Sequence, residues 1–355
     1  MNGEHEFDLL CIGSGPAGQR AAVQAAKLRK RVAIIERELD VGGTCLHTGT
    51  IPSKTFREAV LSFRQTRDRI DELHLDHPSS ERATAEKLLA RVEAIIRSET
   101  RVQRDQLRRN GVNLIPGLAT FVGPNSVNVL TSIGTREVTA HKMLIAVGTK
   151  PHQRPDISTD LECVINSDDI LRLTELPRSI IVIGCGIIGL EYASMFAMLG
   201  VEVTVIDGRE RPLEFLDSEI MEELKHQLRD NLVTFRFGEA VAVIKQRNGP
   251  PRQAMVRLES GKRLVGDMVL ACTGRIGASD ELELDRVGLI VDGRGRIEVD
   301  NPFRSEVPHI FAAGDIIGYP SLAATSSEQG RLAACHAFGV TTGPIRGSRK
   351  VHIGA

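Results

Sequence analysis

The stretch DLLCIGSGPAGQRAAVQAAKLRKRVAIIER, residues 8–37, decides the fold. It begins with a short apolar run, passes through a GxGxxG pattern at Gly13, Gly15 and Gly18, and ends in a second apolar run closed by Glu36. Short apolar runs of this kind are typical of buried parallel strands. The stretch therefore predicts a strand, a tight glycine turn, a helix and a second strand.

A second copy of this pattern lies 171 residues further along the chain. The stretch SIIVIGCGIIGLEYASMFAMLGVEVTVIDG, residues 179–208, aligns with the first without a gap and carries Gly184, Gly186, Gly189 and a closing Asp207. The first glycine permits the turn, the second lets a phosphate approach the backbone, and the third lets helix and strand pack closely. The acid accepts hydrogen bonds from a ribose hydroxyl. Two complete copies predict two dinucleotide sites, one for a flavin and one for a nicotinamide nucleotide.

The repeat also sets the expected domain organisation. We predict an α/β fold with two Rossmann-like dinucleotide-binding domains, the second inserted in the first. Residues 1–150 and 291–340 form the first domain, 151–290 form the second, and 341–355 are a disordered tail. Between the repeats, residues 112–147 are expected to form an antiparallel meander. A preceding helix is expected to bury one face, formed by Ala85, Leu88, Val92, Ile95 and Val102.

Composition excludes several other classes of protein. Among 355 residues, 45 Lys+Arg balance 46 Asp+Glu and only 4% are aromatic, which argues against nucleic acid and membrane surfaces as partners. The apolar run over residues 180–190 is too short to cross a bilayer. Six cysteines occur without CxxC or zinc-ligand spacing, so no metal site is expected. The N-terminus shows no signal-peptide pattern, so we expect a cytoplasmic protein whose partners are small molecules.

Four further segments carry a family resemblance. They are VGGTCLHTGTIPSK (41–54), MLIAVGTKP (143–151), VLACTGR (269–275) and HIFAAGDIIGYPSLAATSSEQGR (309–331). Together with the two glycine patterns, they resemble the two-dinucleotide-binding-domain flavoprotein oxidoreductases, the group of dihydrolipoamide dehydrogenase and glutathione reductase. This resemblance implies FAD in the first domain and NAD(H) or NADP(H) in the second.

The chain departs from the disulfide reductases of this family at Thr50. Those enzymes have a cysteine five residues after the first, whereas Cys45 is followed by Thr50. A threonine forms neither a disulfide nor a thiolate, so the dithiol relay is absent. The same substitution occurs in the soluble, Si-specific NAD(P)+ transhydrogenases of the family, and it implies hydride exchange between NADPH and NAD+ through FAD. A dihydrolipoamide dehydrogenase-like activity, an NAD(P)H diaphorase and a non-catalytic FAD- and NAD-binding remnant stay open as alternatives.

The resemblance also implies roles for individual residues. Lys54 and Glu191 are expected to pair beside the flavin, with Cys45 and Thr50 at the place of the disulfide. The role of Cys45, packing or redox, stays open. Asp207 favours NAD(H), whereas Arg209 and Arg211 can accommodate a 2′-phosphate, so cofactor preference stays open as well. The expected cofactor-binding residues are Gly13, Gly15, Gly18, Glu36, Arg37, Gly42, Gly43, Thr44, Cys45, Lys54, Ala119, Gly148, Gly184, Gly186, Gly189, Asp207, Gly274, Asp315 and Ala323.

The family's interface domain is expected to be largely missing. Members of the family continue for about a hundred residues more and use that domain to build a homodimer. Here the sequence after residue 340 is the short polar stretch TTGPIRGSRKVHIGA.

Overall fold

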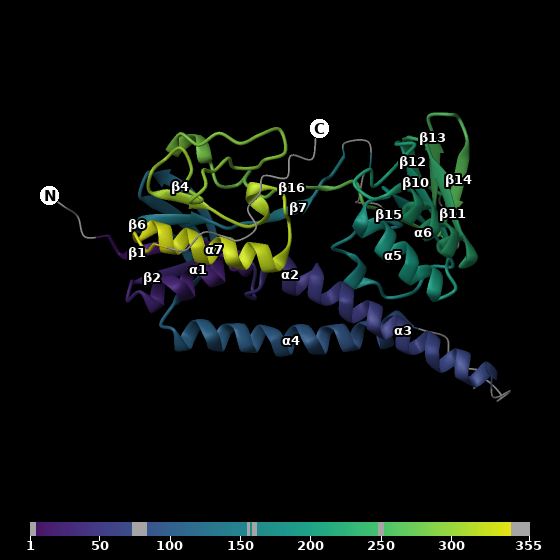
Figure 1. The fold of residues 1–355 in the computed structure, drawn as a ribbon, viewed down its shortest axis with the longest axis horizontal. Coiled ribbons are helices and arrows are strands. Elements are labelled where there is room, and N and C mark those ends of the chain that lie inside the picture. The colour runs from purple at the N-terminus through teal and green to yellow at the C-terminus, as the bar shows by residue number, and fades with distance from the viewer. Residues whose placement is uncertain (1–4, 73–83, 155–156, 158–161, 248–251, 342–355) are drawn as a thin grey trace. The chain divides into compact units, whose positions relative to one another are not determined.

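The computed structural model describes residues 5–72, 84–154, 157, 162–247 and 252–341, which fold into two compact units (Figure 1). Of these residues, 5–51, 96–150 and 276–341 form the first unit. Residues 52–72, 84–95 and the described part of 151–275 form the second. The predicted tail, apart from residue 341, lies outside the described residues.

A parallel sheet with the strand order β3-β2-β1-β6-β17 forms the centre of the first unit. Its strands are β1 (Phe7–Ile12), β2 (Val32–Glu36), β3 (Asn113–Pro116), β6 (Gly134–Ile145) and β17 (Ile310–Ala312). The long strand β6 takes part in both an antiparallel and a parallel arrangement. Residues 134–139 pair antiparallel with β5 (Ser126–Thr131), which pairs with β4 (Leu118–Gly123), while residues 140–145 pair parallel with β1. The predicted meander is therefore correct for β4, β5 and the start of β6, and wrong for β3, which extends the parallel sheet.

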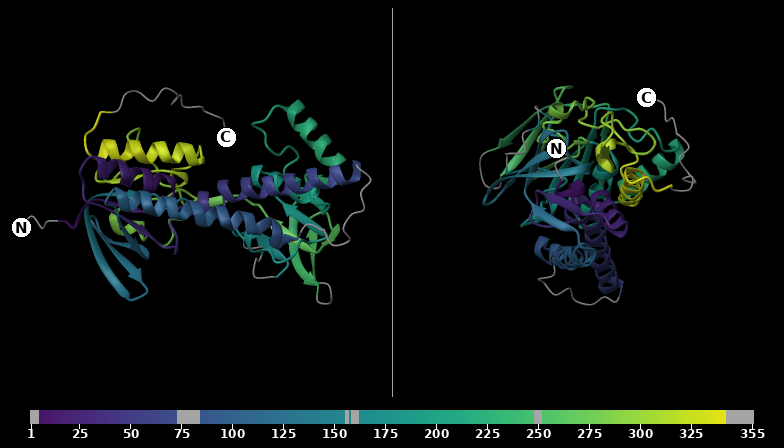
Figure 2. Two further views of the ribbon diagram at one scale, coloured as in Figure 1. Left: turned by 90° about the horizontal axis from the view of Figure 1, so that it is seen from below. Right: turned by 90° about the vertical axis from the view of Figure 1, so that its left-hand side faces the viewer.

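The strands β1, β2 and β17 are buried on both faces of this sheet, which explains why they are almost continuously apolar. Side chains alternate between faces, so Leu9 and Cys11 join one core cluster while Leu10 and Ile12 join the other. The helices α1 (Pro16–Lys27) and α7 (Ala323–Ala337) contribute to the cluster that contains Leu9 and lie side by side (Figures 1 and 2). Their backbones approach closely at Gly330, where an added Cβ would lie 2.0 Å from the carbonyl oxygen of Ala17.

The second unit repeats the parallel arrangement in the order β11-β10-β9-β15-β8. Its strands are β8 (Val164–Asn166), β9 (Ser179–Ile183), β10 (Glu202–Asp207), β11 (Val233–Phe237) and β15 (Met268–Ala271), with helices α5 (Ile187–Met198) and α6 (Ser218–Asp230). An antiparallel sheet of β12 (Val241–Arg247), β13 (Gln253–Leu258) and β14 (Arg263–Gly266) accompanies it. Ile181 and Ile183 of β9 form one core with Ala254 and Val256 of β13. The predicted pair of Rossmann-like folds is confirmed.

The remaining elements connect these sheets. They are α2 (Gly43–His47), α3 (Thr50–Glu72), α4 (Ala85–Arg109), the paired strands β7 (Thr149–Pro151) and β16 (Arg275–Gly277), and the 3₁₀ turns η1 (Ile170–Arg172), η2 (Leu284–Val287) and η3 (Asp315–Ile317). In α4 the predicted apolar face is buried at Ala85, Leu88 and Val92, but Ile95 and Val102 are 38% and 53% exposed.

The two units differ from the predicted domain boundaries in two segments. Residues 52–72 and 84–95 belong to the second unit, where Phe56 of α3 packs against Phe196 of α5 with ring centroids 6.3 Å apart. Residues 276–290 belong to the first unit. Leu282, Leu284 and Val287 enter its core there, and the carbonyl of Leu282 accepts a hydrogen bond from the Phe121 amide of β4.

Candidate functional site

The turn between β1 and α1 requires glycine at two of its three pattern positions. Gly13 has a φ of +101°, and a Cβ there would lie 2.4 Å from the carbonyl oxygen of Ala146. A Cβ on Gly18 would lie 2.0 Å from the carbonyl oxygen of Gly13, so the helix packs directly on the turn. At Gly15, by contrast, an added Cβ meets no atom within 4 Å. The first and third glycines thus build the turn, while the second leaves space open at the N-terminus of α1.

The turn between β9 and α5 has the same geometry. Gly184 has a φ of +104°, and its Cβ would lie 2.3 Å from the carbonyl oxygen of Cys272. A Cβ on Gly189 would lie 2.1 Å from the carbonyl oxygen of Gly184, and one on Gly186 again meets nothing within 4 Å. The amides of Gly13 and Gly184 even donate equivalent hydrogen bonds of 2.8 Å, to Ile35 and Ile206. The repeat in the sequence is therefore a repeat in three dimensions.

These two turns fit the phosphates of a dinucleotide. Gly15 and Gly186 are the N-cap residues of α1 and α5, and no side chain caps either helix. The free amides at a helix N-terminus attract anions, and the missing Cβ at each N-cap leaves room for a phosphate to approach them. Each unit therefore offers one dinucleotide site.

Each site has a buried acid at the end of its second strand. Glu36, 7% exposed, accepts hydrogen bonds from the Ser14 amide (2.8 Å), the Ser14 hydroxyl and the Glu38 amide (3.0 Å). Asp207, also 7% exposed, accepts from the Cys185 amide at 2.7 Å and from Arg209. Ser14 was missed as a site residue, although it stands between two of the pattern glycines and occupies the repeat position of Cys185.

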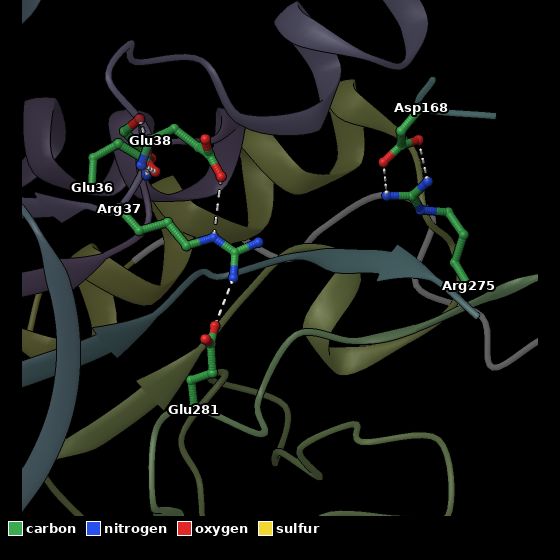
Figure 3. Close-up of polar contacts among 7 residues, drawn as sticks. Glu36, Arg37, Glu38, Asp168, Arg275 and Glu281 are labelled. Carbon is green, nitrogen blue, oxygen red and sulfur yellow. Dashed lines mark hydrogen bonds and ion pairs between the residues drawn. The ribbon is translucent and has the colours of Figure 1, made fainter. Parts of the chain in front are cut away.

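Arg37 lies between acidic side chains in this structure. Its Nη1 is 3.0 Å from Oε2 of Glu281, and its Nε is 3.5 Å from Oε1 of Glu38 (Figure 3). A second arginine pair in Figure 3 belongs to the second unit, where Arg275 and Asp168 form a two-pronged ion pair at 2.9 and 3.4 Å. Neither Glu281 nor Asp168 was predicted, because their partners are 244 and 107 residues away in the sequence.

Gly42 and Gly43 lie against the turn between β1 and α1. Gly42 donates its amide to the carbonyl and the hydroxyl of Ser14, at 3.2 and 3.1 Å. Gly43, with a φ of +58°, approaches so closely that a Cβ there would lie 2.9 Å from the Cα of Gly15. The predicted residues Gly42 and Gly43 therefore lie beside the turn between β1 and α1, and Thr44 and Cys45 follow them in α2.

Cys45 and Thr50 are hydrogen-bonding neighbours. Burial raises the pKa of the Cys45 thiol above its ordinary value, and the charge of Asp315 raises it further. The hydrogen bond with Thr50 acts in the opposite direction without cancelling burial. The Cys45 thiol is therefore held in its protonated form at neutral pH, and its neighbour is a hydroxyl rather than a second thiol.

Lys54 and Glu191 form an ion pair between α3 and α5. The pair joins Nζ of Lys54 to Oε1 of Glu191, with side chains 53% and 38% exposed. Both residues belong to the second unit. Thr50 and Lys54 are one helical turn apart on α3, so they lie on the same face of that helix.

The other predicted residues lie at loops and edges. Ala119 is buried in β4. Gly148 and Gly274 both have positive φ, +66° and +101°, and open space where a Cβ would stand. Asp315 begins η3 and accepts a hydrogen bond from the Ser326 hydroxyl at 3.2 Å, three residues into the α7 helix that starts at Ala323.

No helix among the described residues combines the length and apolarity that a membrane crossing needs. Within the same residues, no group of three or more His, Cys, Asp or Glu side chains is arranged to hold a metal ion.

Known proteins share this organisation. The family model described as pyridine nucleotide-disulphide oxidoreductase matches residues 7–330. The soluble pyridine nucleotide transhydrogenase of Mycobacterium bovis (strain BCG / Pasteur 1173P2) is 48% identical over 343 residues, which cover 96% of this chain and 72% of that protein. Proteins of the same name from Hahella chejuensis and Chromohalobacter salexigens are 40% and 42% identical, each covering 93% of this chain and 70% of the relative.

Solved structures agree with the fold. LpdA from Mycobacterium tuberculosis superposes with a TM-score of 0.85 at 28% identity, covering 95% of this chain and 74% of its own. The HOCl-induced flavoprotein disulfide reductase RclA from Escherichia coli gives a TM-score of 0.83 at 27% identity, covering 94% and 71%. Since the family match runs from the first strand into α7 and includes both glycine turns, the chain belongs to the pyridine nucleotide-disulphide oxidoreductase family.

Proposed function

We propose that the chain is a flavin-dependent NAD(P)+ transhydrogenase that exchanges hydride between NADPH and NAD+, with transfer on the Si face of FAD. The observation that carries the proposal is the hydrogen-bonded pair of Cys45 and Thr50, which stands where a disulfide reductase needs two thiols. Relatives with 40–48% identity that carry the name soluble pyridine nucleotide transhydrogenase support it.

In this proposal the first unit holds FAD. The open N-cap at Gly15 accepts its pyrophosphate, Glu36 accepts from its ribose, and the Gly42–Gly43 turn closes against Gly15. The second unit holds the nicotinamide nucleotide in the same way, with Gly186 at the pyrophosphate and Asp207 near the ribose. When bound, FAD supplies the hydride-carrying chemistry, from one nicotinamide to another.

The protein's own contribution is electrostatic and positional. Transfer of a hydride moves no separate substrate proton, so no general acid or base is required. We assign to Lys54 the task of holding a positive charge where negative charge accumulates, and to Glu191 the task of orienting Lys54. We place this activity in the cytoplasm; the six cysteines, all free thiols, support a reducing compartment.

The test is an anaerobic titration of the purified chain, reconstituted with FAD if it is isolated without it. We expect NADPH to bleach the flavin absorbance and an excess of NAD+ to restore it, with NADP+ and NADH as products. A chain that cannot bind FAD, or whose FAD is not bleached by NADPH, contradicts the proposal and favours a remnant that only binds nucleotides. If NADPH bleaches the flavin absorbance but only oxygen or a quinone, and not NAD+, restores it, the chain is a diaphorase instead.

A further inference from the structure

Residues 278–282, which we call the edge segment, run along β4 in the first unit. The amide of Phe121 donates to the carbonyl of Leu282 at 2.9 Å, and the hydroxyl of Thr120 donates to the carbonyl of Glu281 at 3.2 Å. The opposite edge of β4 pairs with β5, so the edge segment covers the outer side of the meander. Leu282 is 3% exposed and belongs to the core, which fixes the segment in place.

Two neighbouring acids of the edge segment are exposed, and each is held by a cation from another element. Oε2 of Glu281 is 3.0 Å from Nη1 of Arg37, which directly follows β2 (Figure 3). Oδ2 of Asp280 is 2.6 Å from Nζ of Lys150 on β7. The hydrogen bond from Lys150 lowers the pKa of Asp280 against the opposing effect of burial, and the charge of Arg37 lowers it further. Two ion pairs thus fasten adjacent residues of the segment to β2 and β7.

The Arg37–Glu281 pair lies at the corner where the adenosine half of FAD is expected. Arg37 follows the ribose acid Glu36, whose carbonyl accepts a hydrogen bond from the Gly117 amide at 2.8 Å. Gly117 leads into β4, which carries Ala119, the expected adenine contact. The end of β2, the start of β4 and the edge segment therefore meet at this corner, and the side chain of Arg37 joins the first of them to the third.

This ion pair has no counterpart at the second dinucleotide site. The repeat position of Arg37 is Gly208, which has no side chain to form a pair. The difference matches what the proposed function demands of the two ligands. FAD has to stay bound through successive hydride transfers, whereas a nicotinamide nucleotide has to leave after each one. Fastening a pocket wall serves the first site and would slow exchange at the second.

We propose that the edge segment is the outer wall of the adenosine pocket of FAD, and that the Arg37–Glu281 pair is a latch that slows the release of FAD. Glu281 is then a positioning residue. Arg37 acts through this latch rather than on the pyrophosphate, since its Nε and Nη1 already face Glu38 and Glu281 at 3.5 and 3.0 Å. The Lys150–Asp280 pair fastens the same wall a second time. The inference rests on the part of the proposed function that places FAD in the first unit.

The experiment measures the release of FAD rather than turnover. The FAD-loaded full chain is diluted at low and at high NaCl, and the change in flavin fluorescence gives the dissociation rate of FAD. The variants are Glu281→Gln, Arg37→Gln, both together, Glu281→Gln with Asp280→Asn, and the charge-reversed pair Arg37→Glu with Glu281→Arg. Glu283→Gln is the matched control, because its side chain is 45% exposed against 48% for Glu281 but pairs locally with Arg286. Thermal midpoints and the affinity for NADP+ are recorded for all of them.

We expect Glu281→Gln and Arg37→Gln each to speed the release of FAD by about three- to fivefold, the range that an exposed ion pair supports. Because both remove the same interaction, the double variant should be no faster than either single variant. The charge-reversed pair should restore the wild-type rate, and adding Asp280→Asn to Glu281→Gln should speed release by about threefold more. High NaCl should bring the wild-type rate toward that of the variants. Glu283→Gln should release FAD like the wild type, and the thermal midpoint and the affinity for NADP+ should stay unchanged throughout.

Faster release in Arg37→Gln with a wild-type rate in Glu281→Gln overturns the latch and makes Arg37 a direct ligand of FAD. The same holds if the two changes add in the double variant, or if the charge-reversed pair releases FAD as fast as the single variants. Wild-type rates in every variant overturn the inference by leaving the pair without a role in FAD binding. If the wild-type chain cannot be loaded with FAD, the proposed function fails together with the inference, whereas the other results leave the proposed function standing.

Discussion

At the scale of single residues, the proposed function makes Thr50 the residue that limits how many electrons the chain can store. Its hydroxyl hydrogen-bonds to Cys45, and burial keeps the pKa of that thiol above its ordinary value. A protonated thiol next to a hydroxyl neither donates charge to a flavin nor forms a disulfide. Reduction of the FAD-loaded chain should therefore consume two electrons, all of them on the flavin.

Thr50→Cys should raise this number to four. Residue 50 begins α3, and a helix N-terminus lowers the pKa of a cysteine, so the new thiol is placed to ionise and to pair with Cys45. An anaerobic dithionite titration counts the electrons, and a long-wavelength band reports a thiolate beside the flavin. Thr50→Ser, which keeps a hydroxyl, is the control and should stay at two. A wild-type titration that ends at four electrons would show that Cys45 has another redox partner.

Candidate site residues were predictable where their role depends only on the short stretch of sequence around them. The glycines follow from the turn they build, and the acids follow from the strand that each one ends. Ser14, Glu281 and Asp168 were missed because their roles depend on partners that only the folded chain brings near, as with the Arg37–Glu281 pair across 244 residues. The pairing of Lys54 with Glu191 was found only through the family resemblance, since 137 residues separate them.

At the scale of elements, the ion pair between Lys54 of α3 and Glu191 of α5 connects two helices of the second unit. Both side chains are substantially exposed, and exposed pairs contribute little to stability, a median of about 0–1 kcal/mol. The adjacent packing of Phe56 on Phe196 holds the helices together without it. The pair is therefore available for an electrostatic task rather than needed for folding.

Lys54→Met should slow the reduction of FAD by NADPH by about 10- to 100-fold, which corresponds to about 1.4–2.7 kcal/mol. In the proposed function Lys54 is the cation that stabilises the negative charge arriving with the hydride, so its loss should also lower the flavin midpoint potential. Glu191→Gln should be milder, because it misorients the lysine without removing its charge. Stopped-flow reduction and a redox titration measure the two quantities. Arg57→Gln on the same helix is the control and should leave both the reduction rate and the midpoint potential at their wild-type values. If Lys54→Met also leaves both values unchanged, the assignment of Lys54 fails.

Helices and strands were predictable from the spacing of their apolar residues where the same faces are buried along the whole element. The two βαβ units satisfy this condition, since their strands are buried on both faces. The helix α4 does not, because its residues 85–95 belong to one unit and 96–109 to the other. Ile95 lies at that change and is exposed, although its spacing continues the buried row of Leu88 and Val92. The strand β3 was misassigned because a strand of four residues, of which only Ile115 is buried, does not reveal which neighbour it pairs with.

At the scale of the whole molecule, the same strand–turn–helix–strand pattern occurs once in each unit. We therefore expect that a mutation can disable either nucleotide site without affecting the other. Gly15 and Gly186 offer matched positions, since an added Cβ meets no atom within 4 Å at either. Their φ values of −66° and −86° are ones that alanine adopts readily. Alanine at these positions should therefore leave the fold intact and obstruct only a phosphate. Gly18→Ala is the contrasting variant, because its Cβ would lie 2.0 Å from a backbone oxygen and should lower the thermal midpoint.

Gly186→Ala should keep FAD and lose the nicotinamide nucleotide. Its flavin should stay oxidised when NADPH is added at concentrations that bleach the wild type, yet be reduced fully by dithionite, which needs no binding site. Gly15→Ala should show the reverse, with FAD lost or bound at least about 10-fold more weakly and the affinity for NADP+ of the second unit retained. Absorbance spectra and calorimetric titration distinguish the two variants. Loss of both ligands in either variant, at an unchanged thermal midpoint, would mean that the two sites do not act as separate copies.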